Sequence, residues 1–182
     1  MASILRLDMR INTTPVAGRV KAIRRCVSCH ELFYLNLSNY RGNLKKFLDD
    51  TCDELNETWK TDKARLLDIA SRFEESIQTA IRIFSRSNVF RKWDGSRFEK
   101  RLNRAIFDVV AHSLANPKLR KLAIASKDQI LRSFKALCLD EEFRAAIEST
   151  TKSKQAVTNR FATWYKAINQ ATKEKVPVSL PK

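Results

Sequence analysis

The chain has 182 residues, of which 43% are hydrophobic, which is enough to bury the core of one domain. It contains only three glycines and four prolines, whereas sandwich and doubly wound folds need turn residues about every dozen positions. We therefore predict an all-α fold, a single helical domain of six or seven helices. The formal net charge of +15 favours a polyanion as a partner, but does not identify which one.

No stretch approaches the ~20 uninterrupted apolar residues of a membrane-spanning helix. Arg6 and Asp8 also interrupt the apolar run that a secretory signal would need. We expect a soluble, cytoplasmic protein that has no membrane partner. In a reducing compartment the cysteines are expected to be thiols rather than disulfides; they are Cys26, Cys29, Cys52 and Cys138.

The spacing of apolar residues predicts the order of the segments. We expect an irregular N-terminal segment at 1–18, a helical domain at 19–171 and a flexible tail at 172–182. Within the domain, apolar residues three and four positions apart predict helices at about 19–37, 43–60, 62–85, 97–116, 127–138, 141–148 and 154–171. The residues expected to point into the core include Phe73, Ile77, Leu102, Ile106, Phe134 and Phe161.

Several helix ends carry capping residues. Asp62 and Asp140 precede two of the predicted helices, and Ser126 followed three residues later by Gln129 is a capping-box pattern. Asn116 and Pro117 are expected to end the helix that starts near 97. Residues 86–96 are predicted to be a loop.

Positive charge is concentrated in residues 86–135, which hold thirteen basic and four acidic side chains. On the predicted helix 97–116, four of these cations fall on one face, opposite the apolar residues. The candidate nucleic-acid-binding residues are Arg91, Lys92, Arg97, Lys100, Arg101 and Arg104. We expect the Trp93 indole to be free to stack on a ligand, and Asp108 to pair with Arg104 or Arg101. The alternative, and the commoner meaning of such a pattern, is a solvated helix face.

The segment Cys26-Val27-Ser28-Cys29-His30 matches the C-x-x-C-H pattern of covalent haem attachment. The apolar pattern around it favours a coincidence within a core helix. A zinc site would have to recruit Cys52 and His112 from other helices, without a second paired motif. No phosphate-binding loop, nucleophile elbow or metalloprotease motif is present. We therefore expect no cofactor, no metal site and no catalytic residue in this chain.

From about Arg19 onward the sequence resembles the helical C-terminal part of the GmrSD-type restriction family, whose members have a ParB/sulfiredoxin-like N-terminal domain. The segment from Asn39 to Asp49 resembles the family's "Y-x-x-x-L-K-x-F-L" helix entry, and the segment from Arg101 to Asp108 its "R-x-N-x-A-x-F-D" helix. The family's closing pattern is matched by Ile130, Phe134, Leu137, Phe143, Ile147, Thr150, Val157, Arg160, Phe161 and Trp164.

The resemblance implies a role in restriction of phage or other foreign DNA. Family members hydrolyse nucleotides or cut DNA with an N-terminal "D-G-Q-Q-R" segment, and many add an H-N-H nuclease domain; neither motif is present here. We therefore expect a non-catalytic scaffold or binding domain, a truncated or split chain that works with a separate catalytic polypeptide. The alternatives are a free-standing basic helical module that binds DNA or another polyanion, and a c-type haem protein.

Overall fold

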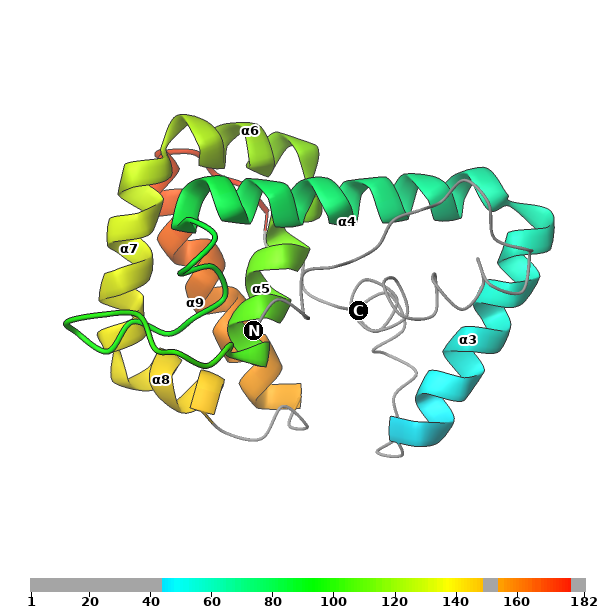
Figure 1. Cartoon of the computed structure of the whole chain (residues 1–182), viewed down its shortest axis with the longest axis horizontal. Helices are drawn as coiled ribbons and strands as arrows, with labels where there is room; N and C mark the ends of the chain where they lie inside the picture. Colours follow the sequence, from blue (N-terminus) through cyan, green and yellow to red (C-terminus); the bar gives the residue numbers. More distant parts are fainter. Residues whose placement is uncertain (1–43, 149–153, 178–182) are drawn as a thin grey trace.

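The computed structural model describes residues 44–148 and 154–177 (Figure 1). The predicted helix at 19–37 and the C-x-x-C-H segment lie outside the described residues. Within them the chain forms seven helices, which are α3 (Leu44–Thr61), α4 (Lys63–Phe84), α5 (Arg104–Ala115), α6 (Pro117–Ala125), α7 (Lys127–Leu139), α8 (Glu141–Glu148) and α9 (Lys154–Thr172). The extended pairing in this part of the chain is a single bridge between Trp93 and Phe98. The all-α prediction is confirmed.

Helix α4 belongs to two hydrophobic clusters. Its N-terminal half packs against α3 in a small cluster of Leu55, Leu66 and Ile69. Its C-terminal half enters the main core with Ile83 and Phe84. Figure 1 shows α3 at the far end of α4, away from the other helices.

The main core lies between α4, α5, α7 and α9 and is centred on aromatic rings. The Phe134 ring lies edge-on to Phe84 at 4.9 Å and to Trp164 at 5.8 Å, measured between ring centroids. The buried indole of Trp164 donates a hydrogen bond of 2.9 Å to the Ser113 hydroxyl on α5. Burial of Phe73, Ile106, Phe134 and Phe161 confirms their predicted inward positions, and Ile77 is half-buried.

Two of the predicted caps form and one does not. The Asp62 carboxylate accepts from the Arg65 amide at 3.0 Å, and the Asp140 carboxylate accepts from the Phe143 amide at 2.8 Å. The prediction of a capping box at Ser126 was wrong, since the Ser126 side chain makes no capping hydrogen bond. Ser126 also ends α6, where its own amide donates to the Leu122 carbonyl. Its ψ of 27° is far from the extended conformation that a capping side chain needs.

Helix α6 was not predicted, because Asn116 and Pro117 were interpreted only as a stop signal. Helix α5 does end at Ala115, but the same two residues also start the next helix. The Asn116 side chain accepts from the amides of Lys118 and Leu119 at 2.9 and 3.2 Å. Pro117 takes the first helical position, where the missing N–H leaves no hydrogen bond unmade.

Helix α5 starts at Arg104, not near residue 97 as predicted. The Asn103 side chain accepts from the Ile106 amide at 3.0 Å and so caps the helix. Leu102, predicted to lie in the core, is 47% exposed. The apolar spacing of Phe98 and Leu102 therefore does not reflect a helix face.

The first part of the predicted tail packs against α9. The Asn169 side chain accepts from the Val176 amide and donates to its carbonyl, both at 3.0 Å, and Val176 is buried. Among the described helices, none combines the length and the apolar composition needed to span a membrane.

Candidate nucleic-acid interface

The predicted cations belong to the loop 85–103 and to the first residue of α5. The loop contains a small hairpin, in which Trp93 pairs with Phe98. The Asp94 amide donates to the Arg97 carbonyl at 3.0 Å, and the Glu99 amide donates to the Lys92 carbonyl at 2.9 Å. Gly95 occupies the turn at a φ of 106°, a conformation that glycine adopts without steric cost.

The Asp94 carboxylate organises this turn. Its Oδ1 accepts from the amides of Arg97 at 2.7 Å and Ser96 at 2.8 Å, and from the Ser96 hydroxyl at 2.9 Å. These hydrogen bonds, led by the one from the Arg97 amide, lower the pKa of Asp94 to about 2. Asp94 therefore remains ionised throughout the physiological range, and it also lies 3.6 Å from the Arg97 guanidinium.

Lys92 fastens the hairpin to α8. Its ammonium lies 2.7 Å from a carboxylate oxygen of Glu148 and 2.8 Å from one of Glu99. The hydrogen bonds to Glu148 and then Glu99 raise the pKa of Lys92, and the hydrogen bond to Lys92 lowers the pKa of Glu148. Only 17% of the Lys92 side chain is exposed, so its charge pairs with carboxylates of the protein itself and is not presented to a ligand.

A second set of contacts holds the base of the loop. The Asn103 amide donates to the Phe90 carbonyl at 2.9 Å, and the Asn103 side chain donates to the Ile147 carbonyl of α8 at 3.2 Å. Phe90 is buried against Phe107, with ring centroids 4.8 Å apart. Its φ of 59° is uncommon for a bulky residue, so packing of the ring holds the backbone in this conformation.

The Trp93 indole is engaged by neighbouring side chains, and the prediction that it is free to stack was wrong. Its ring lies edge-on to Phe98 at 5.1 Å. The Lys135 ammonium of α7 lies 4.0 Å from the indole centroid, within the range of a cation–π interaction. The hairpin is thus tied to α7 as well as to α8.

The six predicted binding residues divide into two groups. Arg91 and Lys92 have partners within the protein. The Arg91 Nη1 group donates to the Glu99 carbonyl at 3.3 Å, and Lys92 pairs with Glu148 and Glu99. The other four side chains are exposed, and among them Arg97 is paired with Asp94. Within the described part of the chain no carboxylate pairs with the remaining three, which we call the basic loop: Lys100, Arg101 and Arg104.

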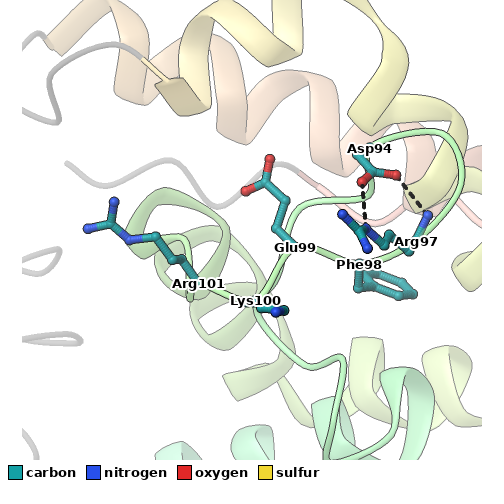
Figure 2. Close-up of a pocket in the computed structure, with 6 residues that line it drawn as sticks. All are labelled: Asp94, Arg97, Phe98, Glu99, Lys100 and Arg101. Atoms are coloured by element: carbon teal, nitrogen blue, oxygen red, sulfur yellow. Dashed lines mark hydrogen bonds and ion pairs between the residues drawn. The ribbon is translucent and has the colours of Figure 1, made fainter.

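Three of the four exposed cations, Arg97, Lys100 and Arg101, line a solvent-open hollow with a volume of about 480 Å³. Figure 2 shows the six residues that line it, with Arg97 turned toward Asp94 and Arg101 extending away from the hairpin. The half-buried ring of Phe98 supplies the aromatic part of this lining. Phe98 was not predicted to line a surface hollow, because its spacing from Leu102 was interpreted as the apolar face of a helix. The signal for it was the turn pair Asp94-Gly95 between two aromatic residues, which is typical of a hairpin.

Asp108 pairs with Arg160 of α9, which corrects the predicted pairing with Arg104 or Arg101. The nearest oxygen of Asp108 lies 3.9 Å from an Arg160 Nη2 atom, and the Arg160 side chain is 1% exposed. The Asp108 carboxylate thus serves the α5–α9 interface rather than the loop.

The described residues offer no metal site, since no group of three histidine, cysteine or acidic side chains among them is arranged to hold an ion. The His112 ring packs edge-on to Phe161 at 5.2 Å. Cys138 is buried, and burial raises the pKa of its thiol to about 11. Both cysteines in this part of the chain, Cys52 and Cys138, are thiols.

Comparison of the chain with protein-family models, curated proteins and solved structures finds no match. The resemblance to GmrSD-type proteins therefore rests on the residues quoted above and stays a prediction.

Proposed function

We propose that this chain is a non-catalytic domain that binds nucleic acid through the basic loop of Lys100, Arg101 and Arg104. The observation that carries the proposal is that these three cations are exposed, lie within five residues of each other, and have no carboxylate partner among the described residues. Cations arranged in this way attract phosphates, and the release of counterions from the nucleic acid favours binding.

The anchoring of the loop supports the same proposal. Lys92 joins the hairpin to Glu148, and Asn103 joins the base of the loop to the Ile147 carbonyl. A loop that is already ordered loses less conformational entropy on binding. The basic loop is therefore pre-organised. Less of the interaction energy of its exposed charges is spent on ordering the loop than in a loop that becomes ordered only on binding.

The experiment compares two triple variants that change the net charge equally. In the first, the basic loop carries Lys100→Glu, Arg101→Glu and Arg104→Glu. In the control, three exposed and likewise unpaired lysines of α6 and α7 are changed: Lys118→Glu, Lys121→Glu and Lys127→Glu. In Figure 1, α6 and the loop 85–103 lie on opposite sides of α4.

Fluorescence anisotropy with a labelled oligonucleotide, over a series of salt concentrations, provides the measurement. We expect the basic-loop variant to bind more weakly and to flatten the slope of log affinity against log salt by about 0.7 to 0.9 for each phosphate that it no longer neutralises. The control should retain most of the binding and most of the slope. Equal weakening in both variants would mean that net charge alone attracts the ligand, and unchanged binding in both would refute the proposal.

A second candidate function is the scaffold of a split GmrSD-like restriction protein. It is favoured by the contact between Asp108 and Arg160, which joins two of the segments that resemble the family. For this candidate we expect a neighbouring reading frame that encodes the "D-G-Q-Q-R" segment, and we expect its protein product to co-purify with this chain. Nucleotide hydrolysis or DNA cleavage by the purified chain alone, in proportion to its concentration, would overturn both candidates.

A further inference from the structure

We propose that the nucleic acid is single-stranded, and that one of its bases stacks on Phe98 in the hollow beside the basic loop. This inference rests on the proposed function and specifies the form of the ligand. It follows from the lining of the hollow, which includes the aromatic Phe98 and two cations, Lys100 and Arg101, that pair with no carboxylate among the described residues.

Phe98 is held as a fixed platform. Its ring lies edge-on to Trp93 at 5.1 Å and nearly parallel to Phe134, with centroids 6.5 Å apart and planes inclined at 14°. The Lys135 ammonium also lies 5.7 Å from the Phe98 centroid. These neighbours fix the orientation of the ring against the main core, and Phe98, which is half-buried, is one of the residues that line the hollow. A fixed aromatic surface of this kind is what base stacking requires.

The two carboxylates that line the hollow do not oppose a phosphate strongly. Asp94 accepts three hydrogen bonds from the turn and pairs with Arg97. Glu99 lies 2.8 Å from the Lys92 ammonium. Each of these carboxylates thus has a cationic partner in the hairpin, although Glu99 shares Lys92 with Glu148. Among the described residues, Lys100 and Arg101 are the lining cations that no carboxylate pairs with.

A single strand matches both features, whereas a duplex matches only one. In a duplex the bases are stacked on one another and paired, so that a flat aromatic ring in a hollow finds no free base to contact. The phosphates of a duplex would engage the cations and leave Phe98 unused. A single strand offers a base face and neighbouring phosphates together, the combination that stacking surfaces with cationic borders bind.

The test uses three labelled probes of about 12 nucleotides each, a length that a single-strand site can cover. The first is a thymidine oligomer, the second is the same oligomer annealed to its complement, and the third is an abasic strand with the same number of phosphates. We expect wild-type protein to bind the thymidine oligomer about fivefold or more tightly than the abasic strand, because the abasic strand has no base to stack. We also expect the duplex to bind more weakly than the thymidine oligomer.

Two variants test whether the aromatic ring of Phe98 itself gives the preference for the thymidine oligomer over the abasic strand. Phe98→Leu keeps an apolar side chain against Trp93 and Phe134 but removes the aromatic face, so the preference for thymidine over abasic strand should disappear while abasic binding persists. Leu102→Ala, at an exposed neighbouring position outside the lining, should leave the preference intact. Circular dichroism melts establish that both variants are folded.

The outcomes distinguish this inference from the proposed function. Equal wild-type affinity for thymidine and abasic strands, or tighter binding of the duplex, overturns the stacking inference while binding through the basic loop stands. If none of the three probes binds in a salt-dependent way, the proposed function itself fails. The comparison of probes on wild-type protein decides the question even if Phe98→Leu does not fold.

Discussion

Lys92 and Glu148, which are 56 residues apart in the chain, meet in an ion pair of 2.7 Å that fastens the hairpin to the end of α8. Lys92 also pairs with Glu99, so that its removal takes a cation from two carboxylates, of which Glu148 keeps the Arg144 guanidinium at 3.9 Å. We expect Lys92→Met to lower the free energy of unfolding by about 1 kcal/mol, near the upper end for a partly exposed pair. The matched control is Lys60→Met, which breaks the exposed pair with Glu57 on α3 and should cause no measurable change in urea denaturation.

The same pair predicts a dependence of stability on pH. Because the pKa of Glu148 is lower in the folded protein than its usual value of 4.5, the pair contributes stability above that value and loses it as the pH falls through the folded pKa. Wild type should therefore be more stable than Glu148→Gln at about pH 6, and the difference should shrink toward about pH 3. A difference that stays constant over this range would show that the Glu148 charge is not the cause.

Asp94 should titrate at about pH 2, well below its usual value of 3.8. NMR titration of its side-chain carboxyl carbon measures this directly, and a pKa near 3.8 would contradict the geometry of the turn. Asp94→Asn keeps an oxygen that can accept from the amides of Ser96 and Arg97, whereas Asp94→Ala removes it. We expect the amide resonances of Ser96 and Arg97 to move strongly in the alanine variant and little in the asparagine variant.

The effects on stability of substituting Trp164 and Ser113 should be strongly coupled, because the hydrogen bond that joins the two side chains is buried. Ser113→Ala leaves the indole N–H without this acceptor and should cost about 1 to 3 kcal/mol. In Trp164→Phe the Ser113 hydroxyl still donates to the Val110 carbonyl at 2.9 Å. The double variant should therefore be destabilised by less than the sum of the two single variants, as measured by urea denaturation. Additive effects would mean that the hydrogen bond contributes nothing of its own.

Helix α6 should depend on the Asn116 side chain for its first turn. Asn116→Ala removes the acceptor for the amides of Lys118 and Leu119 and should lower the free energy of unfolding by about 1 kcal/mol. Asn116→Asp, which can accept the same hydrogen bonds, should restore most of it. Thermal melts of the three proteins give the comparison, and an alanine variant as stable as wild type would show that packing of Leu119 alone holds the helix.

Local features of the sequence predicted the helices that local interactions control. The intervals of three and four residues between apolar side chains placed α7, α8 and α9 within a residue or so of their observed ends. Asp62 and Asp140 identified the starts of α4 and α8, since a cap bonds to amides only a few residues away. The signal for the start of α6 is equally local, because Asn116 caps the helix and Pro117 is its first residue. These two residues were interpreted only as the end of the preceding helix.

The position of the cations was decided by tertiary structure. The sequence alone determined that the chain is helical, that positive charge is concentrated between residues 86 and 135, and which side chains carry it. Periodicity extended the apolar pattern of α5 back to Phe98, but the pairing of Trp93 with Phe98 and the Asn103 cap place those residues in a hairpin and its loop. Whether a cation is free to bind a phosphate depends on the acids near it in space, and Lys92 meets Glu148 only because α8 packs against the hairpin. Pairings between residues so far apart in the chain leave no periodic trace in the sequence. The fold alone therefore separates the paired cations from the three cations of the basic loop, which have no carboxylate partner in the described part of the chain.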